Sequence, residues 1–322
     1  MMLPVGNKSN PYRPIRPAAA VGAPRSDKVH SSRIGLVRGP ITLATVPFMR
    51  FHVIDAFTDR PFAGNPAGVC LLPAGDWPDD PWMQRVAAEL NFSESAFALP
   101  AATPDADWEI RWFTPLVETN LCGHATLATT HALRTERGLA GAVRFRSRHS
   151  GGLLARADKD GAITLDFPAA PVTETPVPAG LADVLGLTPE ATYRTGALGD
   201  LLAVLPDEAA VRDAAPDLPA MAGLTRREAL RGVILTAPPA RADQGHDFVS
   251  RFFSPAEGIA EDPVTGSAHT ALAPYWSARL GRGALTGRQL SARTGLVRTA
   301  LHADRVHLTG HAVTILTGDL HV

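Results

Sequence analysis

Two stretches of the sequence, RWFTPLVETNLCGHA at residues 111–125 and RFFSPAEGIAEDPVTGSA at residues 251–268, follow the same plan. Each starts with an arginine, two aromatic residues, a hydroxyl residue and a proline, and each ends in glycine, a polar residue and alanine. Gly123 and Gly266 then open runs that are typical of helices closed by a later glycine. Because the unit occurs twice, about 140 residues apart, it predicts two pseudo-symmetric domains whose helix N-termini face each other across a cleft.

Short strands surround both predicted helices. Alternating runs bounded by turn residues predict strands within 50–72, 95–100, 108–115, 143–167, 200–206, 232–238, 246–255, 288–294, 295–301, 305–310 and 312–318. Two further helices are expected, one at 79–90 with Asp80 as its cap and Pro81 at its first helical position, and one within 207–215. This order predicts an α+β fold in which each domain has strands around a central helix. The final strand, near 312–318, is expected to cross back to the first half.

Changes in composition suggest where the chain divides. Residues 1–48 are rich in proline, arginine, alanine and serine, almost free of acids, and lack the apolar core of a signal peptide. We expect a disordered extension there; an organelle transit peptide and a misassigned start codon upstream of Met49 are the alternatives. The proline- and glycine-rich stretch 168–180 predicts a linker between an N-terminal half at 49–170 and a C-terminal half at 176–322.

Charge and cysteine content exclude several classes of protein. The net charge of the 322 residues is −1, so no electrostatic field points to a nucleic acid or an anionic membrane. Cys70 and Cys122 are too few for a disulfide framework, and no Cys/His spacing predicts a metal site. Apolar runs are too short for a transmembrane helix. We therefore expect a soluble, cytoplasmic protein without a nucleic-acid or membrane partner.

The end of the second unit, EDPVTGSAHTAL at residues 261–272, allows two interpretations. Asp262 and Ser267 are good N-cap residues, and a carboxylate near a helix N-terminus is stabilised by the helix dipole. Alternatively, the N–H groups of a helix opened by Gly266 hold an anionic group of a ligand. On this stretch alone, capping is the more common arrangement.

Four motifs together resemble one known family. The motifs FHVIDAFTDRPFAGNPAGV, LNFSESAF, RWFTPLVETNLCGHATLA and EDPVTGSAH are similar, in order, to those of the PhzF-like isomerases of phenazine biosynthesis, from Met49 to the C-terminus. The resemblance implies the diaminopimelate epimerase-like fold, in which each of two domains is a β-barrel wrapped around a central helix, with the active site between them. It also implies a homodimer and an isomerase that moves a proton within a small carboxylate, with no cofactor and no metal. The substrate itself stays open.

The resemblance assigns catalytic roles to four positions. Glu94, in FSESAF, matches the acid/base glutamate of the family, and such a group needs a pKa raised toward neutrality by burial. His124 matches the active-site histidine, and the helix N-terminus would favour its neutral form. Asp262 and Ser267 match the remaining acid and hydroxyl, so the resemblance favours a binding site over capping at this helix.

Substrate-binding positions follow from the same match. Gly123 and Gly266 open the paired helices, and the absence of a side chain there would let the backbone approach a ligand closely. Asn65, in AGNPAG, matches a family position, although a turn-forming asparagine would also explain it.

A rival mechanism within the same fold uses two thiols. Racemases and epimerases of this superfamily place a cysteine before each helix glycine, and Cys122 occupies the first of these places. Thr265 occupies the second, and a threonine hydroxyl is far too weak an acid to replace a thiolate. Cys70 lies in a predicted strand, which is typical of a buried core residue. A non-catalytic binding or scaffold protein that retains the pocket is the remaining alternative.

Overall fold

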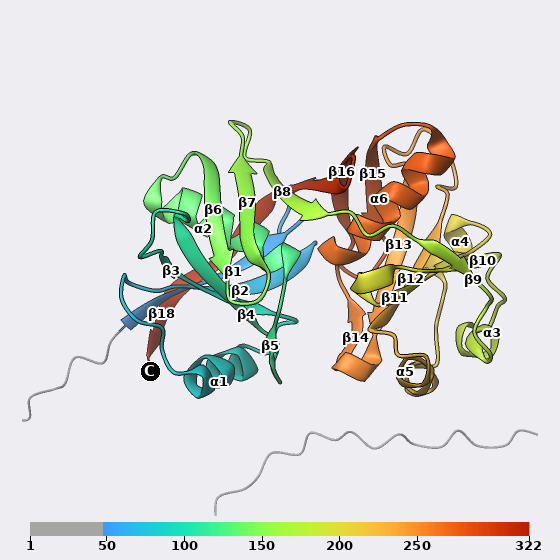
Figure 1. The fold of residues 1–322 in the computed structure, drawn as a ribbon, viewed down its shortest axis with the longest axis horizontal. Helices are drawn as coiled ribbons and strands as arrows, with labels where there is room; N and C mark the ends of the chain where they lie inside the picture. Colours follow the sequence, from blue (N-terminus) through green and yellow to red (C-terminus); the bar gives the residue numbers. More distant parts are fainter. Residues whose placement is uncertain (1–47, 322) are drawn as a thin grey trace, which may run out of the picture. The chain divides into compact units, whose positions relative to one another are not determined.

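The computed structural model describes residues 48–321, which form one compact unit (Figure 1). The extension predicted at residues 1–48 lies outside the described residues, apart from Phe48, which begins the first strand. None of the helices in the described range is long and apolar enough to cross a lipid bilayer.

The first half of the described chain builds strands around one long helix. Its elements are β1 (Phe48–Ala56), β2 (Asn65–Leu71), α1 (Asp80–Leu90), β3 (Ser95–Pro100), β4 (Trp108–Phe113), β5 (Glu118–Thr119), α2 (Gly123–Arg137), β6 (Gly141–Ser147), β7 (Gly151–Ala157) and β8 (Ile163–Pro168). Helix α2 packs against β1, β2, β3, β7 and β8, and its Leu127 and Leu133 share a core with Ile110 and Phe145. Its threonines tolerate burial because their hydroxyls donate to backbone carbonyls four residues back.

The second half repeats this plan and adds an outer layer of helices. Its elements are β9 (Thr173–Thr175), α3 (Leu181–Leu185), β10 (Ala191–Arg194), η1 (Gly196–Leu198), β11 (Asp200–Val204), α4 (Glu208–Arg212), α5 (Leu218–Arg227), β12 (Gly232–Ala237), β13 (Phe248–Ser254), η2 (Pro255–Glu257), β14 (Ile259–Asp262), α6 (Gly266–Leu280), β15 (Ala284–Gln289), β16 (Gly295–His302), β17 (Arg305–Gly310) and β18 (Ala312–His321). Helix α6 packs on β15, β16 and β17, and its Trp276 stacks on Phe248 of β13 with ring centroids 5.8 Å apart. Helices α3, α4 and α5 cover a separate core on β11, β12 and β13.

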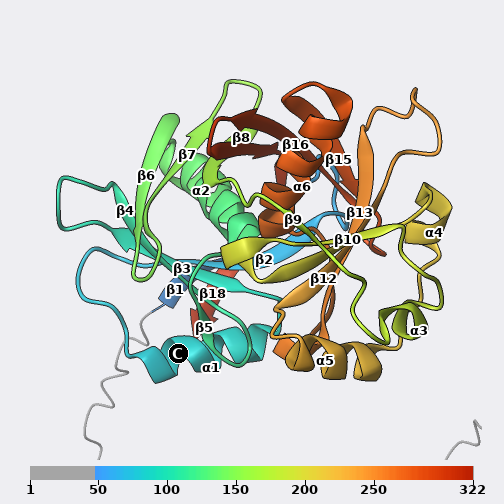
Figure 2. The ribbon, with the colours of Figure 1, turned by 45° about the vertical axis from the view of Figure 1, so that its right-hand side comes forward.

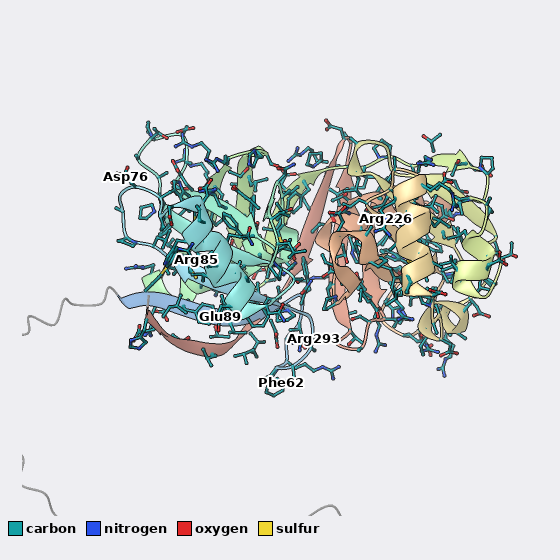
Figure 3. All side chains as sticks on the ribbon, turned by 90° about the horizontal axis from the view of Figure 1, so that it is seen from below. Phe62, Asp76, Arg85, Glu89, Arg226 and Arg293 are labelled. Atoms are coloured by element: carbon teal, nitrogen blue, oxygen red, sulfur yellow. The ribbon has the colours of Figure 1, made fainter. Side chains whose placement is uncertain are left out.

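The strands of the two halves join in one hydrogen-bonded network. Strand β8 pairs with β17, and β1 pairs with both β2 and β18, so the last strand lies beside the first (Figure 1). Arg293, which follows β15, reinforces this seam: its Nη2 lies 2.7 Å from Oδ1 of the buried Asp55 in β1. Figure 3 shows Arg293 and Phe62 at this seam; the backbone N–H of Phe62 donates to the other oxygen of Asp55.

The central helices α2 and α6 contact each other in the middle of the unit, and α1 and α5 lie along one outer edge (Figure 2). The prediction of an α+β fold with strands around a central helix in each half is therefore confirmed. The boundary assigned to 168–180 contains the short strand β9, which pairs with β10. A single break between the halves at that point stays a proposal.

Two local predictions are corrected. Asp79, and not Asp80, caps α1, because its side chain accepts a hydrogen bond from the backbone N–H of Trp82 at 3.0 Å. The strand expected at 288–294 begins earlier, at Ala284, and ends at Gln289, because the chain bends over residues 291–293 before β16 begins at Gly295.

Helix α5 was not predicted from the sequence. Its start nevertheless carries two ordinary helix signals, the cap Asp217, which accepts from the N–H of Ala220, and a proline in the first turn. Asp217 and Pro219 are therefore the signals in the sequence from which this helix could have been predicted.

Candidate active site

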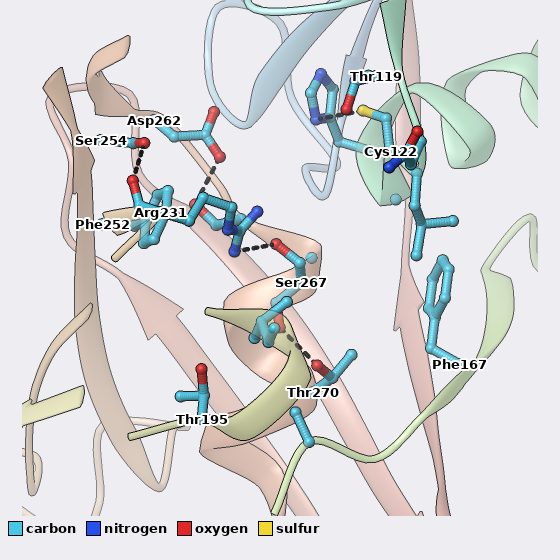
Figure 4. A pocket seen from close by; sticks show the side chains of 18 of the residues that line it. Thr119, Cys122, Phe167, Thr195, Arg231, Phe252, Ser254, Asp262, Ser267 and Thr270 are labelled. Carbon is cyan, nitrogen blue, oxygen red and sulfur yellow. Dashed lines mark hydrogen bonds between the residues drawn. The ribbon is translucent and has the colours of Figure 1, made fainter. Parts of the chain in front are cut away.

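The N-termini of α2 and α6 meet at the junction of the two halves. A Cβ atom built on Gly123 would lie 3.5 Å from the Cα of Gly266, and the reverse distance is the same. In front of the two helices lies a cavity of about 710 Å³, within the usual range for small-molecule sites (Figure 4). Both halves contribute to its wall, so the site depends on their association.

Neither helix start is capped by a side chain. Cys122 and Thr265 occupy the N-cap positions, and neither makes a side-chain cap hydrogen bond within the described residues. Asp262 instead accepts from Asn65 and Thr265, and Ser267 accepts from a neighbouring arginine. Capping is therefore the wrong interpretation of the stretch 261–272. The first turns keep N–H groups available to a ligand at the positive end of each helix dipole.

Glu94 directly precedes β3 and faces the histidine of α2. Its Oε2 lies 3.6 Å from Nε2 of His124. This nitrogen is buried and has no hydrogen-bond partner within residues 48–321. On the other side of the ring, Sγ of Cys122 lies 3.4 Å from Nδ1. The Glu94 side chain is 15% exposed, so a molecule in the cavity can reach its carboxylate.

A hydrogen-bond network that spans both halves holds His124 and Asp262. Asn65, at the start of β2, donates to Oδ1 of Asp262 at 2.7 Å, and its Nδ2 lies 3.2 Å from Nδ1 of His124. The Thr265 hydroxyl donates to Oδ2 of Asp262 at 2.5 Å. Asn65 Nδ2 cannot accept a hydrogen bond, and its two hydrogens are shared among Asp262, the carbonyl of Val264 at 2.9 Å and Nδ1 of His124. A proton on Nδ1 would therefore face a donor, so the proton of the neutral ring is assigned to Nε2, facing Glu94.

Burial sets the charge of the ionisable groups in the site. It raises the pKa of Glu94 to about 8, and the neighbouring Asp262 carboxylate adds to this rise. It raises the pKa of Asp262 to about 6, against the hydrogen bonds from Thr265 and Asn65. It lowers the pKa of His124 to about 3, so burial is the cause of the neutral ring. Near pH 7 the site therefore contains a neutral imidazole and two carboxyl groups of different acidity.

The thiol of Cys122 stays protonated in this environment. Burial is the main cause that raises its pKa well above the ordinary value, and the charge of Glu94 raises it further. A thiol in this state is a poor base.

One cation, Arg231, stands among the described residues that line the cavity. It directly precedes β12, and its Nε and Nη2 lie 2.9 and 2.5 Å from the two carboxylate oxygens of buried Asp200. Its Nη2 also donates to Oγ of Ser267 at 3.0 Å (Figure 4). Neither Arg231 nor Asp200 was predicted from the sequence.

The sequence pattern that defines the family described as phenazine biosynthesis-like protein matches residues 54–318. The chain belongs to this family. The resemblance found in the sequence motifs is thereby confirmed.

Relatives of known sequence support this membership over nearly their full length. A Pseudomonas aeruginosa protein named as an uncharacterized isomerase is 44% identical over 270 residues, which cover 84% of this chain and 97% of the relative. A mouse phenazine biosynthesis-like domain-containing protein is 37% identical over 283 residues, with 83% of this chain and 97% of the relative covered. Because its relatives include several named isomerases, this phenazine biosynthesis-like protein is identified as an isomerase.

Solved structures confirm the fold. A PhzF-family protein from Enterococcus faecalis superposes with a TM-score of 0.77 at 36% identity, over 86% of this chain and all of that one. A hydroxyproline epimerase from Agrobacterium vitis superposes with a TM-score of 0.59 at 13% identity, over 85% of this chain and 93% of that one. The latter likeness shows that the phenazine biosynthesis-like chain shares the fold of the epimerases.

The structure brings the predicted site residues together in this family member. Eight of them line the cavity: Glu94, Cys122, Gly123, His124, Asp262, Thr265, Gly266 and Ser267. The ninth, Asn65, contacts His124 and Asp262 from behind. Cys70 is a fully buried core residue, as expected from its strand.

Three of these side chains could also hold a metal ion. The ligand atoms of Glu94, Cys122 and His124 lie within 4.8 Å of one another. A carboxylate, a thiolate and an imidazole form a donor set that suits a zinc ion. Such binding would require the loss of the Cys122 proton, which burial opposes.

Proposed function

We propose that this phenazine biosynthesis-like protein is a cofactor-independent isomerase that moves a proton between two carbons of a small carboxylate. Glu94 serves as the acid/base that carries the proton. The observation that supports this proposal best is the Glu94 carboxyl group itself, which is partly exposed to the cavity, faces the unpartnered Nε2 of His124 and has a pKa of about 8. A group with such a pKa can both take and return a proton near neutral pH.

The reaction would proceed in two proton transfers. Ionised Glu94 takes a proton from one carbon, and the electron pair of that C–H bond moves into the adjacent conjugated system. The double bond shifts, and protonated Glu94 returns the proton to a second carbon. Neutral His124 would donate from Nε2 to the ionised form of Glu94, while Asp262 would accept a hydrogen bond from a substrate amine or hydroxyl.

The substrate carboxylate would bind at the paired helix starts. Ser267 and the first-turn N–H groups that follow Gly123 and Gly266 would serve as donors, since no side chain caps either helix within the described range. Cβ atoms added at the two glycines would touch the opposite helix start at ordinary contact distance, so the glycines allow the two N-termini to lie close together.

Replacement of Glu94 by glutamine tests the proposal. Small unsaturated or cyclic carboxylates are screened by NMR for incorporation of solvent deuterium, and turnover of the responding compound is then measured. Glu94→Gln keeps the shape and removes the ionisable group, so turnover should fall by about 10²–10⁴ while ligand binding persists. Glu257→Gln, which changes another glutamate of the cavity wall, should retain activity.

Two further experiments distinguish the competing mechanisms. Cys122→Ser should retain most activity, and prior dialysis against a chelator should leave the rate unchanged. An inactive serine variant together with an active Glu94→Gln variant would show that sulfur carries the proton, as in the racemase-like alternative. Loss of the rate after chelation, with recovery on addition of zinc, would contradict the proposal of a metal-free reaction. A wild-type protein that binds carboxylates but catalyses no exchange would favour the binding-protein alternative.

The homodimer and the cytoplasmic location implied by the family resemblance are also proposed. Sedimentation of the purified chain tests the first, and fractionation of the source cells tests the second.

A further inference from the structure

One edge of the Arg231 guanidinium group is bound by a carboxylate of the protein itself. Nε and Nη2 both bind Asp200, whose side chain is fully buried. The ring of Phe252 lies against one face of the group, with its centroid 5.1 Å from Cζ. These contacts fix the plane of the guanidinium before any ligand arrives.

The other edge of the group is open to the cavity. Nη1 has no hydrogen-bond partner among residues 48–321, and 36% of the Arg231 side chain is exposed. Figure 4 shows the guanidinium reaching toward Ser267 at the start of α6. Because Ser267 Oγ accepts from Nη2, its own proton is free to be donated to another group.

These two neighbouring donors match the two oxygens of a carboxylate. Arg231 and Ser267 are hydrogen-bonded to each other, so Nη1 of the arginine and the hydroxyl of the serine lie close together. One ionised carboxylate can therefore accept from both groups. The charge of Arg231 also matters to the cavity as a whole. The cavity wall also contains the acidic side chains Glu257 and Asp262, whose carboxylates would repel an entering anion in the absence of a cation.

We propose that Arg231 determines charge specificity: with Ser267 it binds the ionised carboxylate of the substrate and discriminates against neutral analogues such as amides and esters. The buried partner Asp200 positions the guanidinium. This assignment rests on the proposed function only for the statement that the bound carboxylate belongs to a substrate. The binding of an anion at Arg231 can be measured without any reaction.

Benzoate and benzamide form a matched pair of unreactive probes, since they differ in charge and hardly in shape. Their dissociation constants are measured by NMR titration for the wild type and for Arg231→Met combined with Asp200→Asn. The double change avoids leaving Asp200 as an unpaired buried charge, and circular dichroism checks that the variant folds. The wild type should prefer benzoate by about 10- to 100-fold, and the variant should lose that preference. Arg231→Lys should keep part of the preference for benzoate.

Arg251→Met is the matched control. Arg251 also binds a carboxylate through Nε and Nη2, that of Glu261, and also lies over a phenylalanine, Phe253, but it does not line the cavity. This variant should keep the preference for benzoate. A wild type without that preference, or a double variant that retains it, would overturn the assignment. Glu94→Gln should still bind benzoate, so failure of the proton-transfer proposal would appear in the exchange assay and not here.

Discussion

Glu94 and His124 show how a buried position changes the chemistry of an ordinary side chain. Glu94 follows a helix and precedes a strand, where an exposed glutamate would be unexceptional, but burial and the nearby Asp262 raise its pKa to about 8. His124 loses its charge for the same reason, with a pKa of about 3. The pair can therefore keep a proton on the carboxyl group near neutrality, where a solvated glutamate would be ionised.

The raised pKa of Glu94 predicts a specific dependence of stability on pH. Between its ordinary value of 4.5 and about 8, the folded state keeps the proton and the unfolded state loses it. The wild type should therefore lose stability as pH rises through this window, by about 1.4 kcal/mol for each pH unit at most. The glutamine of Glu94→Gln does not titrate, so the free energy of unfolding of this variant should rise relative to that of the wild type as the pH rises.

Chemical denaturation at several pH values between 5 and 9 measures this difference. A difference between variant and wild type that stays constant with pH would mean that Glu94 titrates as a solvated group.

At the scale of elements, the site consists of two helix starts that are not used for capping. Cys122 and Thr265 stand at N-cap positions without serving as caps, and the following glycines meet across the cleft. The sequence predicted this arrangement from the repeat alone, because a glycine-opened helix after a proline loop is a local pattern. It also suggested that Asp262 caps α6, and this failed because the partners of Asp262, Asn65 among them, come from elsewhere in the chain.

Gly266→Ala should separate stability from function. The added Cβ would meet protein atoms only at 3.5 Å or more, and alanine is the better helix former, so stability should stay equal or rise by about 0.5–1 kcal/mol. Ligand binding should nevertheless weaken, because the methyl group would lie between the two helix starts that line the cavity. Thermal unfolding and benzoate titration measure the two effects.

Gly223→Ala, within α5, provides the control. No atom lies within 4 Å of its added Cβ, and α5 lies away from the cavity, so stability should rise and binding should not change. Unchanged benzoate binding by Gly266→Ala would contradict the placement of the carboxylate at α6.

At the scale of the whole molecule, the cavity exists only because the two halves are joined. Pairing of β8 with β17 and of β1 with β18 fixes the halves against each other. The Asp55–Arg293 ion pair closes the same seam, and the Asp55 side chain is only 2% exposed. A substitution at this seam should therefore lower the stability of the fold, and it should affect the site only through the association of the two halves.

Arg293→Met should lower the free energy of unfolding by about 3–5 kcal/mol, because it leaves the buried Asp55 carboxylate without its cation. Arg305→Met removes a comparable contact with Asp166, but both partners are partly exposed, so the loss should be below about 1 kcal/mol. Urea denaturation compares the two variants with the wild type. Equal losses would show that the seam pair contributes no more than a surface ion pair.

The sequence by itself determined the repeat, the central helices and the family motifs that carry Glu94, His124, Asp262 and Ser267. Turn chemistry and apolar periodicity are local, so they reveal the repeat and the helices; the four side chains were assigned by the resemblance of the motifs to the family. Only the tertiary structure decided that Arg231 belongs to the site. It is 31 residues from Asp200 and 36 from Ser267, and folding alone brings the three together. Burial likewise depends on contacts between distant segments, so the raised pKa of Glu94 follows from packing that no local pattern encodes.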